Sequence, residues 1–313
     1  MSADYGLGRG YSASIRLNLQ HFLWKQQLGY NLHPRIPTGS PGLKIADVAT
    51  GTGAWLFDVA LSLPNAQVDG FDISFGQLPS LNGLPQNVSC KILDAFGEIP
   101  VEFRGHYDIV HSRMLSLAIK SGNPTPLFKN LLSMLRPGGW IQYGDCDHPT
   151  MYLQRKEAEK PSAIAWELYS KGYAMMMEQY PQQWTAHLDK YLLAAGASDV
   201  QMWRYPIETP FAHKAFTDNQ LAAFHEMSYH ITPTAGVDPE GFRDLLGEVS
   251  RIYPKGADIY YCPAVCIGMK PLVAEAEPQL EEVRPCREGT MSGLTESDNW
   301  DVIDGDDETL ETE

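Results

Sequence analysis

Along residues 41–147, short apolar runs typical of strands alternate with apolar residues at helical spacing. Short apolar runs predict strands at Leu43–Ala49, Gln67–Ile73, Val88–Leu93, Tyr107–His111 and Trp140–Tyr143. Between them, Leu56–Leu63 and Phe128–Leu135 carry apolar residues at helical spacing, and Pro137-Gly138-Gly139 predicts a turn. Strands that alternate with helices predict a parallel sheet with helices on both faces, in which ligands bind beyond the carboxyl ends of the strands.

The chain after residue 147 reads as mostly helical. Thr217 with Gln220 predicts a capping box, and Asp238-Pro239 predicts the start of another helix. A helical stripe from Leu188 ends at Gly196. Val200–Tyr205 and Ile259–Met269 are expected as strands at the sheet edge, where Pro263 argues against a fully paired position.

A row of aromatic and methionine side chains from Trp166 to Tyr180 follows helical spacing. It fits a core stripe; the alternative is a lid helix over an apolar ligand, which its place directly after the fifth strand supports. We therefore predict four parts: a helical leader (1–40), a core (41–147), a helical lid with C-terminal strands that complete the sheet (148–270), and a disordered acidic tail (271–313).

Composition narrows the function classes. The formal net charge is −15, but residues 271–313 hold 14 acidic and 2 basic side chains, so the rest is nearly neutral. Without a basic face, nucleic acid is not an expected partner. No apolar run is long enough to span a membrane, and the first ten residues lack signal-peptide order, so we expect a cytoplasmic protein. Five cysteines without a CxxC pair, and no ligand set elsewhere, predict no metal.

The strongest chemical signal is Asp47-Val-Ala49-Thr-Gly51-Thr-Gly53 at the first strand-to-helix turn. Short side chains there let a ligand approach backbone N–H groups. Asp72 ends the second strand, where a carboxylate can accept hydrogen bonds from both hydroxyls of a ribose. Asp94-Ala95 ends the third strand, where an adenine amino group could meet a carboxylate.

The turn does not fit a dinucleotide or a P-loop. Leu56 stands at the third glycine position of the dinucleotide fingerprint, and no Gly-Lys-Ser/Thr follows. Asp47 before the turn disfavours a pyrophosphate and suits an amino group. The pattern therefore favours a nucleoside with a cationic tail.

The combination of these motifs resembles class I S-adenosylmethionine-dependent methyltransferases. Besides the turn and the two aspartates, Tyr107-Asp-Ile-Val-His111-Ser-Arg113 and Leu135-Arg-Pro-Gly-Gly-Trp140-Ile carry the likeness, with Ala49 in place of the usual first glycine. The leader, Tyr11–His21 with Gly29–Pro34, resembles fungal secondary-metabolite methyltransferases of the LaeA-like kind. The resemblance implies a Rossmann-like, seven-stranded, mostly parallel sheet, with the run ending at Lys270-Pro271 as the last strand.

The resemblance also implies roles for individual residues around S-adenosyl-L-methionine. Ala49, Gly51 and Gly53 would let the backbone pass the methionine portion, and Asp47 would orient its amino group. Asp72 would hold the ribose, Ile73 would pack on adenine, and Asp94 with the Ala95 N–H would read its edge. Tyr11 and Arg16 would close over the cofactor, with Arg16 on the carboxylate, and His111 would join the site. Arg113 fits a site residue and a structural ion pair equally.

The expected activity is methyl transfer to a small apolar natural product in secondary metabolism, with oxygen favoured over nitrogen or carbon. His148 is the candidate base, because it follows the fifth strand and histidine is the usual proton acceptor; a plain loop histidine is the alternative. Two other functions remain open: a cofactor-binding cyclase (a pericyclase) that transfers no methyl group, and a non-catalytic regulator acting through the acidic tail. The expected partner is the small-molecule substrate, and a homodimer is left open.

Overall fold

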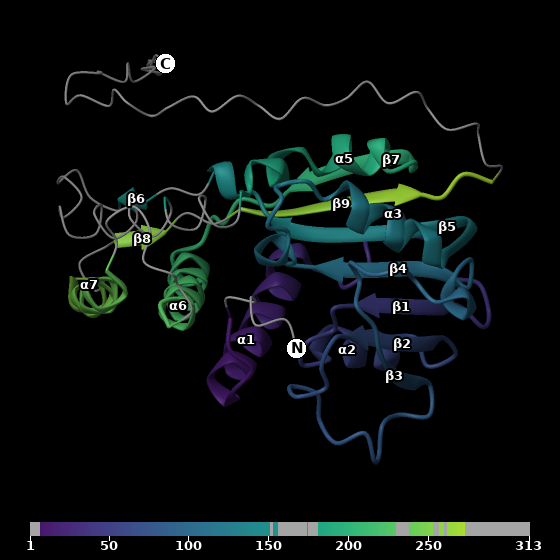
Figure 1. The fold of residues 1–313 in the computed structure, drawn as a ribbon, viewed down its shortest axis with the longest axis horizontal. Helices are drawn as coiled ribbons and strands as arrows, with labels where there is room; N and C mark the ends of the chain where they lie inside the picture. The colour runs from purple at the N-terminus through teal and green to yellow at the C-terminus, as the bar shows by residue number, and fades with distance from the viewer. Residues whose placement is uncertain are drawn as a thin grey trace, which may run out of the picture. The chain divides into compact units, whose positions relative to one another are not determined.

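The five apolar runs of residues 41–147 form neighbouring parallel strands of one sheet. The computed structural model describes residues 7–150, 153–155, 174, 181–229, 238–252, 257–259 and 262–272. The seven-stranded sheet has the order β3-β2-β1-β4-β5-β9-β7 (Figure 1). Its strands are β1 Lys44–Val48, β2 Gln67–Asp72, β3 Val88–Ile92, β4 Tyr107–Arg113, β5 Leu135–Cys146, β7 Ser198–Arg204 and β9 Pro263–Met269. The first five strands pair in parallel, and β9 runs antiparallel to β5 and β7. The expected α/β class is confirmed.

Helices pack on both faces of this sheet because successive strand side chains point to opposite sides. Ile45 faces a core shared with α1, α2 and α6, whereas its neighbour Ala46 faces a core shared with α3 and α5. The α-helices are α1 Tyr11–Leu28, α2 Ala54–Ser62, α3 Thr125–Met134, α5 Leu188–Ala194, α6 Pro210–Met227 and α7 Pro239–Ile252. The 3₁₀ helices are η1 Val101–Phe103, η2 Ser116–Ala118, η3 His148–Thr150 and η4 Gln183–His187. Two short strands, β6 Leu153–Arg155 and β8 Ala257–Ile259, form a separate antiparallel pair.

Four local predictions are wrong. Pro137-Gly138-Gly139 is not a turn but an irregular stretch inside β5, where the register with β4 shifts between Tyr107 and Ile109. Thr217 lies inside α6, which begins at Pro210 with the Thr209 side chain accepting the Ala212 N–H. β9 is paired on both sides despite Pro263, because the proline is its first residue. The expected single strand Ile259–Met269 is divided between β8 and β9.

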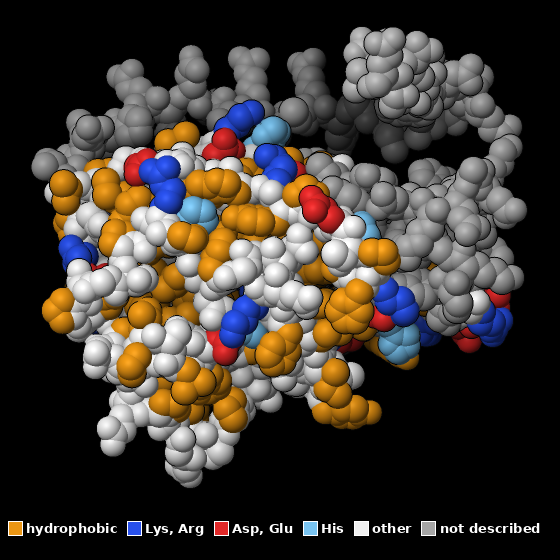
Figure 2. Space-filling view, turned by 180° about the vertical axis from the view of Figure 1, so that it is seen from behind, with side chains coloured by type: hydrophobic (Ala, Val, Ile, Leu, Met, Phe, Trp, Pro, Cys, Tyr) orange, Lys and Arg blue, Asp and Glu red, His pale blue; other side chains and the backbone are white. Residues whose placement is uncertain are grey.

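The sequence expectations also concern the possible lid helix, the acidic tail, membrane-spanning helices and the charge of the surface. Apart from Ala174, the row from Trp166 to Tyr180 lies outside the described residues, as does the acidic tail from residue 273. Among the described helices, none combines the length and hydropathy needed to cross a membrane. On the face drawn in Figure 2, Lys and Arg side chains are interspersed with Asp and Glu and with apolar side chains rather than gathered in one basic patch.

The leader helix α1 is fixed to α6 by a buried ion pair. Arg16 Nε and Nη2 donate to the two carboxylate oxygens of Glu226 at 3.0 and 3.2 Å, and the two side chains are 4% and 11% exposed. The Asn219 side-chain amide also donates to the Arg16 carbonyl at 2.8 Å. The parallel fork geometry is the strong form of an arginine–carboxylate contact. The leader therefore packs on the C-terminal part of the chain.

This pair makes a stability prediction. Arg16→Met should lower the free energy of unfolding by about 3–5 kcal/mol, because it leaves the Glu226 carboxylate buried without its cation. The double variant Arg16→Met/Glu226→Leu should recover most of that loss, since no charge is then buried. Chemical denaturation measures both values, and a single variant as stable as the wild type would contradict the arrangement.

Candidate functional site

The turn between β1 and α2 is built on left-handed backbone. Ala49, Gly51 and Gly53 have φ angles of 61°, 58° and 76°. For Ala49 this conformation costs about 1–2 kcal/mol, because its Cβ crowds the following carbonyl. A Cβ on Gly53 would in addition lie 2.6 Å from the Phe57 ring. Gly53 is thus needed for packing against α2, whereas a Cβ on Gly51 would meet the Leu17 side chain at an ordinary contact distance of 3.6 Å.

Asp72, at the end of β2, is fixed by backbone donors. Its Oδ2 accepts the Gly51 N–H at 2.9 Å and its Oδ1 accepts the Ser74 N–H at 3.1 Å. Burial raises the pKa of Asp72, against the effect of these two hydrogen bonds. A carboxylate has about four lone-pair positions, so two positions are left for a ligand.

A cavity of about 370 Å³ lies beside Asp72 at the carboxyl ends of the strands. The volume is within the range typical of small-molecule sites, about 300–1,000 Å³. The cavity contains four of the residues that the resemblance assigns to the nucleoside: Asp72, Ile73, Asp94 and Ala95. Its remaining lining is Arg9, Leu17, Ala49, Gly51, Gln77, Leu93, Phe96, Leu115, Leu117, Ala118 and Lys120. Asp94 is exposed, and its Oδ1 accepts the Phe96 N–H at 3.0 Å. We call this cavity the larger pocket.

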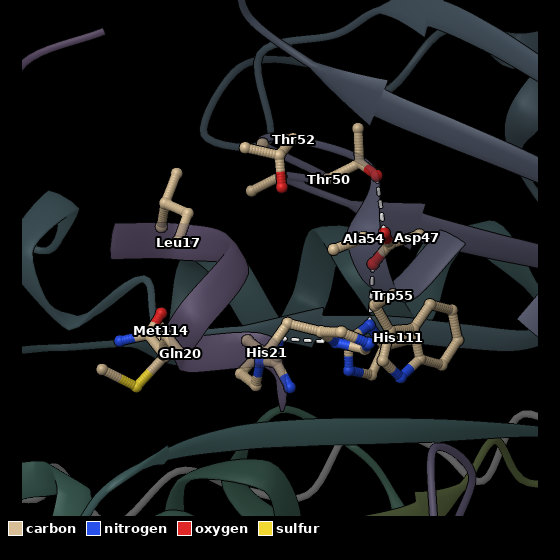
Figure 3. A pocket seen from close by; sticks show the side chains of 13 residues that line it. Leu17, Gln20, His21, Asp47, Thr50, Thr52, Ala54, Trp55, His111 and Met114 are labelled. Atoms are coloured by element: carbon tan, nitrogen blue, oxygen red, sulfur yellow. Dashed lines mark hydrogen bonds and ion pairs between the residues drawn. The ribbon is translucent and has the colours of Figure 1, made fainter. Parts of the chain in front are cut away.

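A second cavity of about 60 Å³, the smaller pocket, lies on the other side of the turn. The two pockets share Leu17, Ala49 and Gly51. In Figure 3, Leu17, Gln20 and His21 of α1 lie across from Asp47, Thr50 and His111. The other lining residues are Thr52, Ala54, Trp55, Arg113 and Met114. The arrangement can take an elongated ligand that passes Gly51 from one pocket into the other.

Asp47 and His111 form a buried pair in the smaller pocket. His111 Nδ1 lies 2.7 Å from Asp47 Oδ1, and the Thr50 hydroxyl donates to Asp47 Oδ2 at 2.6 Å (Figure 3). The His111 ring stacks on Trp55 at 3.7 Å between centroids. Burial lowers the pKa of His111, although hydrogen bonding to Asp47 opposes the shift. Both residues thus line the pocket while each is already engaged inside the protein.

Tyr11 and Arg16 do not line either pocket. The Tyr11 side chain is 85% exposed, and Arg16 is engaged by Glu226. The expectation that these two residues close over the ligand differs from the observed arrangement, because the face of α1 that meets the turn carries Leu17, Gln20 and His21 instead. Gln20 and His21 share one face of α1 with the buried Trp24. This helical spacing of polar residues beside a buried tryptophan was the signal in the sequence that could have identified them.

His148, the candidate base, lies in a buried polar cluster beyond β5. Its Nε2 is 3.3 Å from the Ser116 hydroxyl and 3.6 Å from Asp145 Oδ1. Both contacts involve the same ring nitrogen, which excludes a serine–histidine–aspartate relay, since that needs the two nitrogens on different partners. His148 Nδ1 is buried without a hydrogen-bond partner among the described residues. Nδ1 is therefore the ring nitrogen left for a proton, although His148, like Tyr11 and Arg16, lines neither pocket.

Comparisons with known proteins identify relatives of part of this chain. A family model described as a methyltransferase domain matches residues 45–139. The methyltransferase grgD of a Penicillium species is 36% identical over 151 residues, which are 46% of this chain and 52% of grgD. The N-methyltransferase tcpN of Claviceps purpurea is 32% identical over 159 residues, 50% of this chain and 55% of tcpN. The matches therefore span about half the length of these curated relatives.

Similarity to solved structures is more distant. Phosphoethanolamine N-methyltransferase 2 of Haemonchus contortus, in complex with S-adenosyl-L-methionine, aligns with a TM-score of 0.44 at 14% identity. The alignment covers 81% of this chain and 57% of that protein.

The buried histidines predict how stability depends on pH. Burial lowers the pKa of His21, His33 and His111 below the ordinary 6.5. Below pH 6.5 the unfolded chain therefore binds protons that the folded protein does not, so the free energy of unfolding should fall as the pH falls. Between pH 7 and 5.5 we expect a loss of about 1 kcal/mol or more, at up to about 1.4 kcal/mol per pH unit for each histidine.

Urea denaturation between pH 7 and 5.5 measures how steeply the free energy of unfolding depends on pH. His33→Asn should reduce it without touching either pocket, because Asn keeps an acceptor for the Arg35 N–H. A free energy of unfolding that stays flat down to pH 5.5 would show that these histidines bind protons equally in the folded and unfolded chain, which contradicts the lowered pKa values.

Proposed function

We propose, from the premise that residues 45–139 belong to the S-adenosylmethionine-dependent methyltransferase domain family, that this chain transfers a methyl group to a small natural product. The observation that carries the proposal is the Gly51–Asp72 contact between two contiguous pockets. An adenosine needs a fixed carboxylate for its ribose and an apolar cavity for its base, and the larger pocket offers both.

The residues present fit S-adenosyl-L-methionine. Asp72 would hold the ribose hydroxyls with its two remaining acceptor positions. Ile73, Asp94 and Ala95 would contact the adenine, and the amino-acid end would pass Gly51 into the smaller pocket. When bound, the cofactor supplies a methyl group on a positively charged sulfur.

The acceptor atom is nitrogen or oxygen of a small molecule. The sequence alone favours oxygen, whereas the name of the Claviceps relative supports nitrogen. Either acceptor must lose a proton during transfer. His148 would take this proton at Nδ1, while Ser116 and Asp145 hold the other side of its ring.

Cofactor binding gives the first test. Asp72→Ala should weaken binding of S-adenosylhomocysteine at least about 10-fold by calorimetry, because it removes charge-assisted hydrogen bonds to the ribose. The matched control Asp218→Ala, at an exposed position of α6, should leave the affinity unchanged. Equal affinities in the wild type and Asp72→Ala would refute the site.

Turnover gives the second test. His148→Ala should lower the rate of S-adenosylhomocysteine formation with an accepted substrate by about 100-fold, the usual range for a positioned base, and spare cofactor affinity. His148→Gln controls for packing and should be equally slow. Mass spectrometry of the product identifies the methylated atom, and substrate conversion without S-adenosylhomocysteine would replace methyl transfer with a cyclisation.

A further inference from the structure

Four apolar side chains lie exposed along one face of α1: Tyr11, Ile15, Leu19 and Phe22. Their exposed fractions are 85%, 63%, 37% and 61%, in that order. Residues three or four positions apart are neighbours on a helix surface, so the four side chains form one continuous strip, which we call the apolar stripe. The opposite face of the helix carries Arg16, Gln20 and Trp24, which are buried against the rest of the protein.

The apolar stripe is large for the surface of a single protein. An aromatic side chain has about 150–250 Å² of surface to bury, so Tyr11 and Phe22 together expose about 300 Å². Ile15 and Leu19 extend this area. It therefore reaches the size of the largest apolar patches on monomeric proteins, about 300–600 Å², which are often functional.

A groove of about 470 Å³ adjoins the stripe, between α1, the start of α2 and the loop after β2. Phe22 belongs to both the stripe and the groove, and Phe57, Leu78 and Pro79 add further apolar lining. A stable protein interface buries about 800 Å² on each partner, of which the stripe alone supplies about half. A partner that covered the stripe and the groove walls together would approach this area.

The charge of this surface narrows the choice of partner. Between residues 10 and 24, the exposed positions of α1 carry no charged side chain, because Arg16 is buried and paired with Glu226. Helices that bind lipid surfaces are rich in Lys and Arg beside their apolar face. A partner recognised by its charge would likewise find no counter-charge on the stripe. The matching surface is another uncharged apolar one, and a second copy of this chain presents it.

The spacing along α1 also fits pairing of the helix with itself. Steps of four, three, four and three residues, the spacing of helices that pack side by side, connect Tyr11, Ile15, Asn18, Phe22 and Lys25. In an antiparallel pair centred on Asn18, Ile15 faces Phe22 of the other copy, and the two Asn18 amides meet at the two-fold axis. Tyr11 then faces Lys25, an ammonium group against an aromatic ring. A parallel pair would instead place the two Lys25 side chains, which are like charges, opposite each other.

We propose that the apolar stripe and the adjoining groove form the interface of a homodimer, in which the α1 helices of two copies pair antiparallel about Asn18. The inference goes beyond the proposed function, because this pairing needs neither cofactor nor acceptor. His21 lines both the groove and the smaller pocket. The second copy would therefore cover α1 on the side away from Glu226, next to the smaller pocket.

Sedimentation equilibrium of the full chain tests the interface. The wild type should have the mass of two chains at micromolar concentration, in about 0.15 M salt to screen the net charge of −15. Ile15→Glu and Phe22→Lys each place a charge against an apolar side chain, so each should raise the dissociation constant at least about 100-fold. Both positions are exposed in the single chain, so both variants should keep the wild-type circular dichroism spectrum.

A matched control places the same charge on another apolar position. Leu193 of α5 is 51% exposed and lies on the other side of the sheet from α1. Leu193→Glu should remain a dimer with the wild-type dissociation constant. A wild type that sediments as a single chain throughout, or an Ile15→Glu variant that is still a dimer, would overturn the inference.

A mixture of the two charged variants tests the antiparallel arrangement. When an Ile15→Glu chain meets a Phe22→Lys chain, one contact pairs the two new charges and the other keeps Ile15 against Phe22. The mixture should therefore sediment as a dimer, although each variant alone does not. A mixture that stays monomeric would overturn the antiparallel pairing, because a parallel pair sets each new charge against an apolar side chain.

Vesicles of phosphatidylcholine and phosphatidylserine test the other occupant of the stripe. The wild type should stay in the supernatant when these vesicles are pelleted. A wild type that pellets with them, together with an Ile15→Glu variant that does not, would assign the stripe to a lipid surface and overturn the homodimer.

Discussion

The hydrogen bond from the Gly51 amide to the Asp72 carboxylate determines where both pockets lie. Neighbouring parallel strands β1 and β2 end side by side, with Val48 opposite Phe71. The turn after β1 must then bend sharply enough to aim an N–H at the next strand, which requires left-handed backbone at Ala49 and Gly51. One pocket opens on each side of this bond.

The fold could be predicted because its signals are local. Each apolar run of residues 41–147 coincides with one strand to within a residue at either end or lies inside it, and alternation within the strand records burial on two faces. The errors arose where tertiary contacts outweigh local preference. A capping box at Thr217 contributes about 1 kcal/mol, whereas starting α6 at Pro210 also buries Ala212 and Phe216. Pro137-Gly138-Gly139 reads as a turn in isolation, and pairing with β4 draws it into β5.

The site could be predicted only where strand ends converge. Asp72, Asp94 and the glycine turn follow consecutive parallel strands, so topology alone brings them to one edge of the sheet. The residues of α1 have no such constraint. Arg16 and His21 lie five positions apart on this helix, and which of them meets α6 or the turn depends on how the helix is rotated in its packing. Sequence cannot supply that rotation, so it could not show that Arg16 meets Glu226 of α6 while His21 meets the turn.

The wall of the smaller pocket depends on where α1 packs, and the motifs that carry the family likeness do not encode this packing. Residues 45–139, which carry the family likeness, supply the turn and the nucleoside side of the larger pocket. Leu17, Gln20 and His21, which wall the smaller pocket, come from a helix outside that segment. The same helix is joined to α2 through Asp58 and to α6 through Glu226. The smaller pocket therefore depends on the tertiary contacts of α1 as well as on the glycine turn.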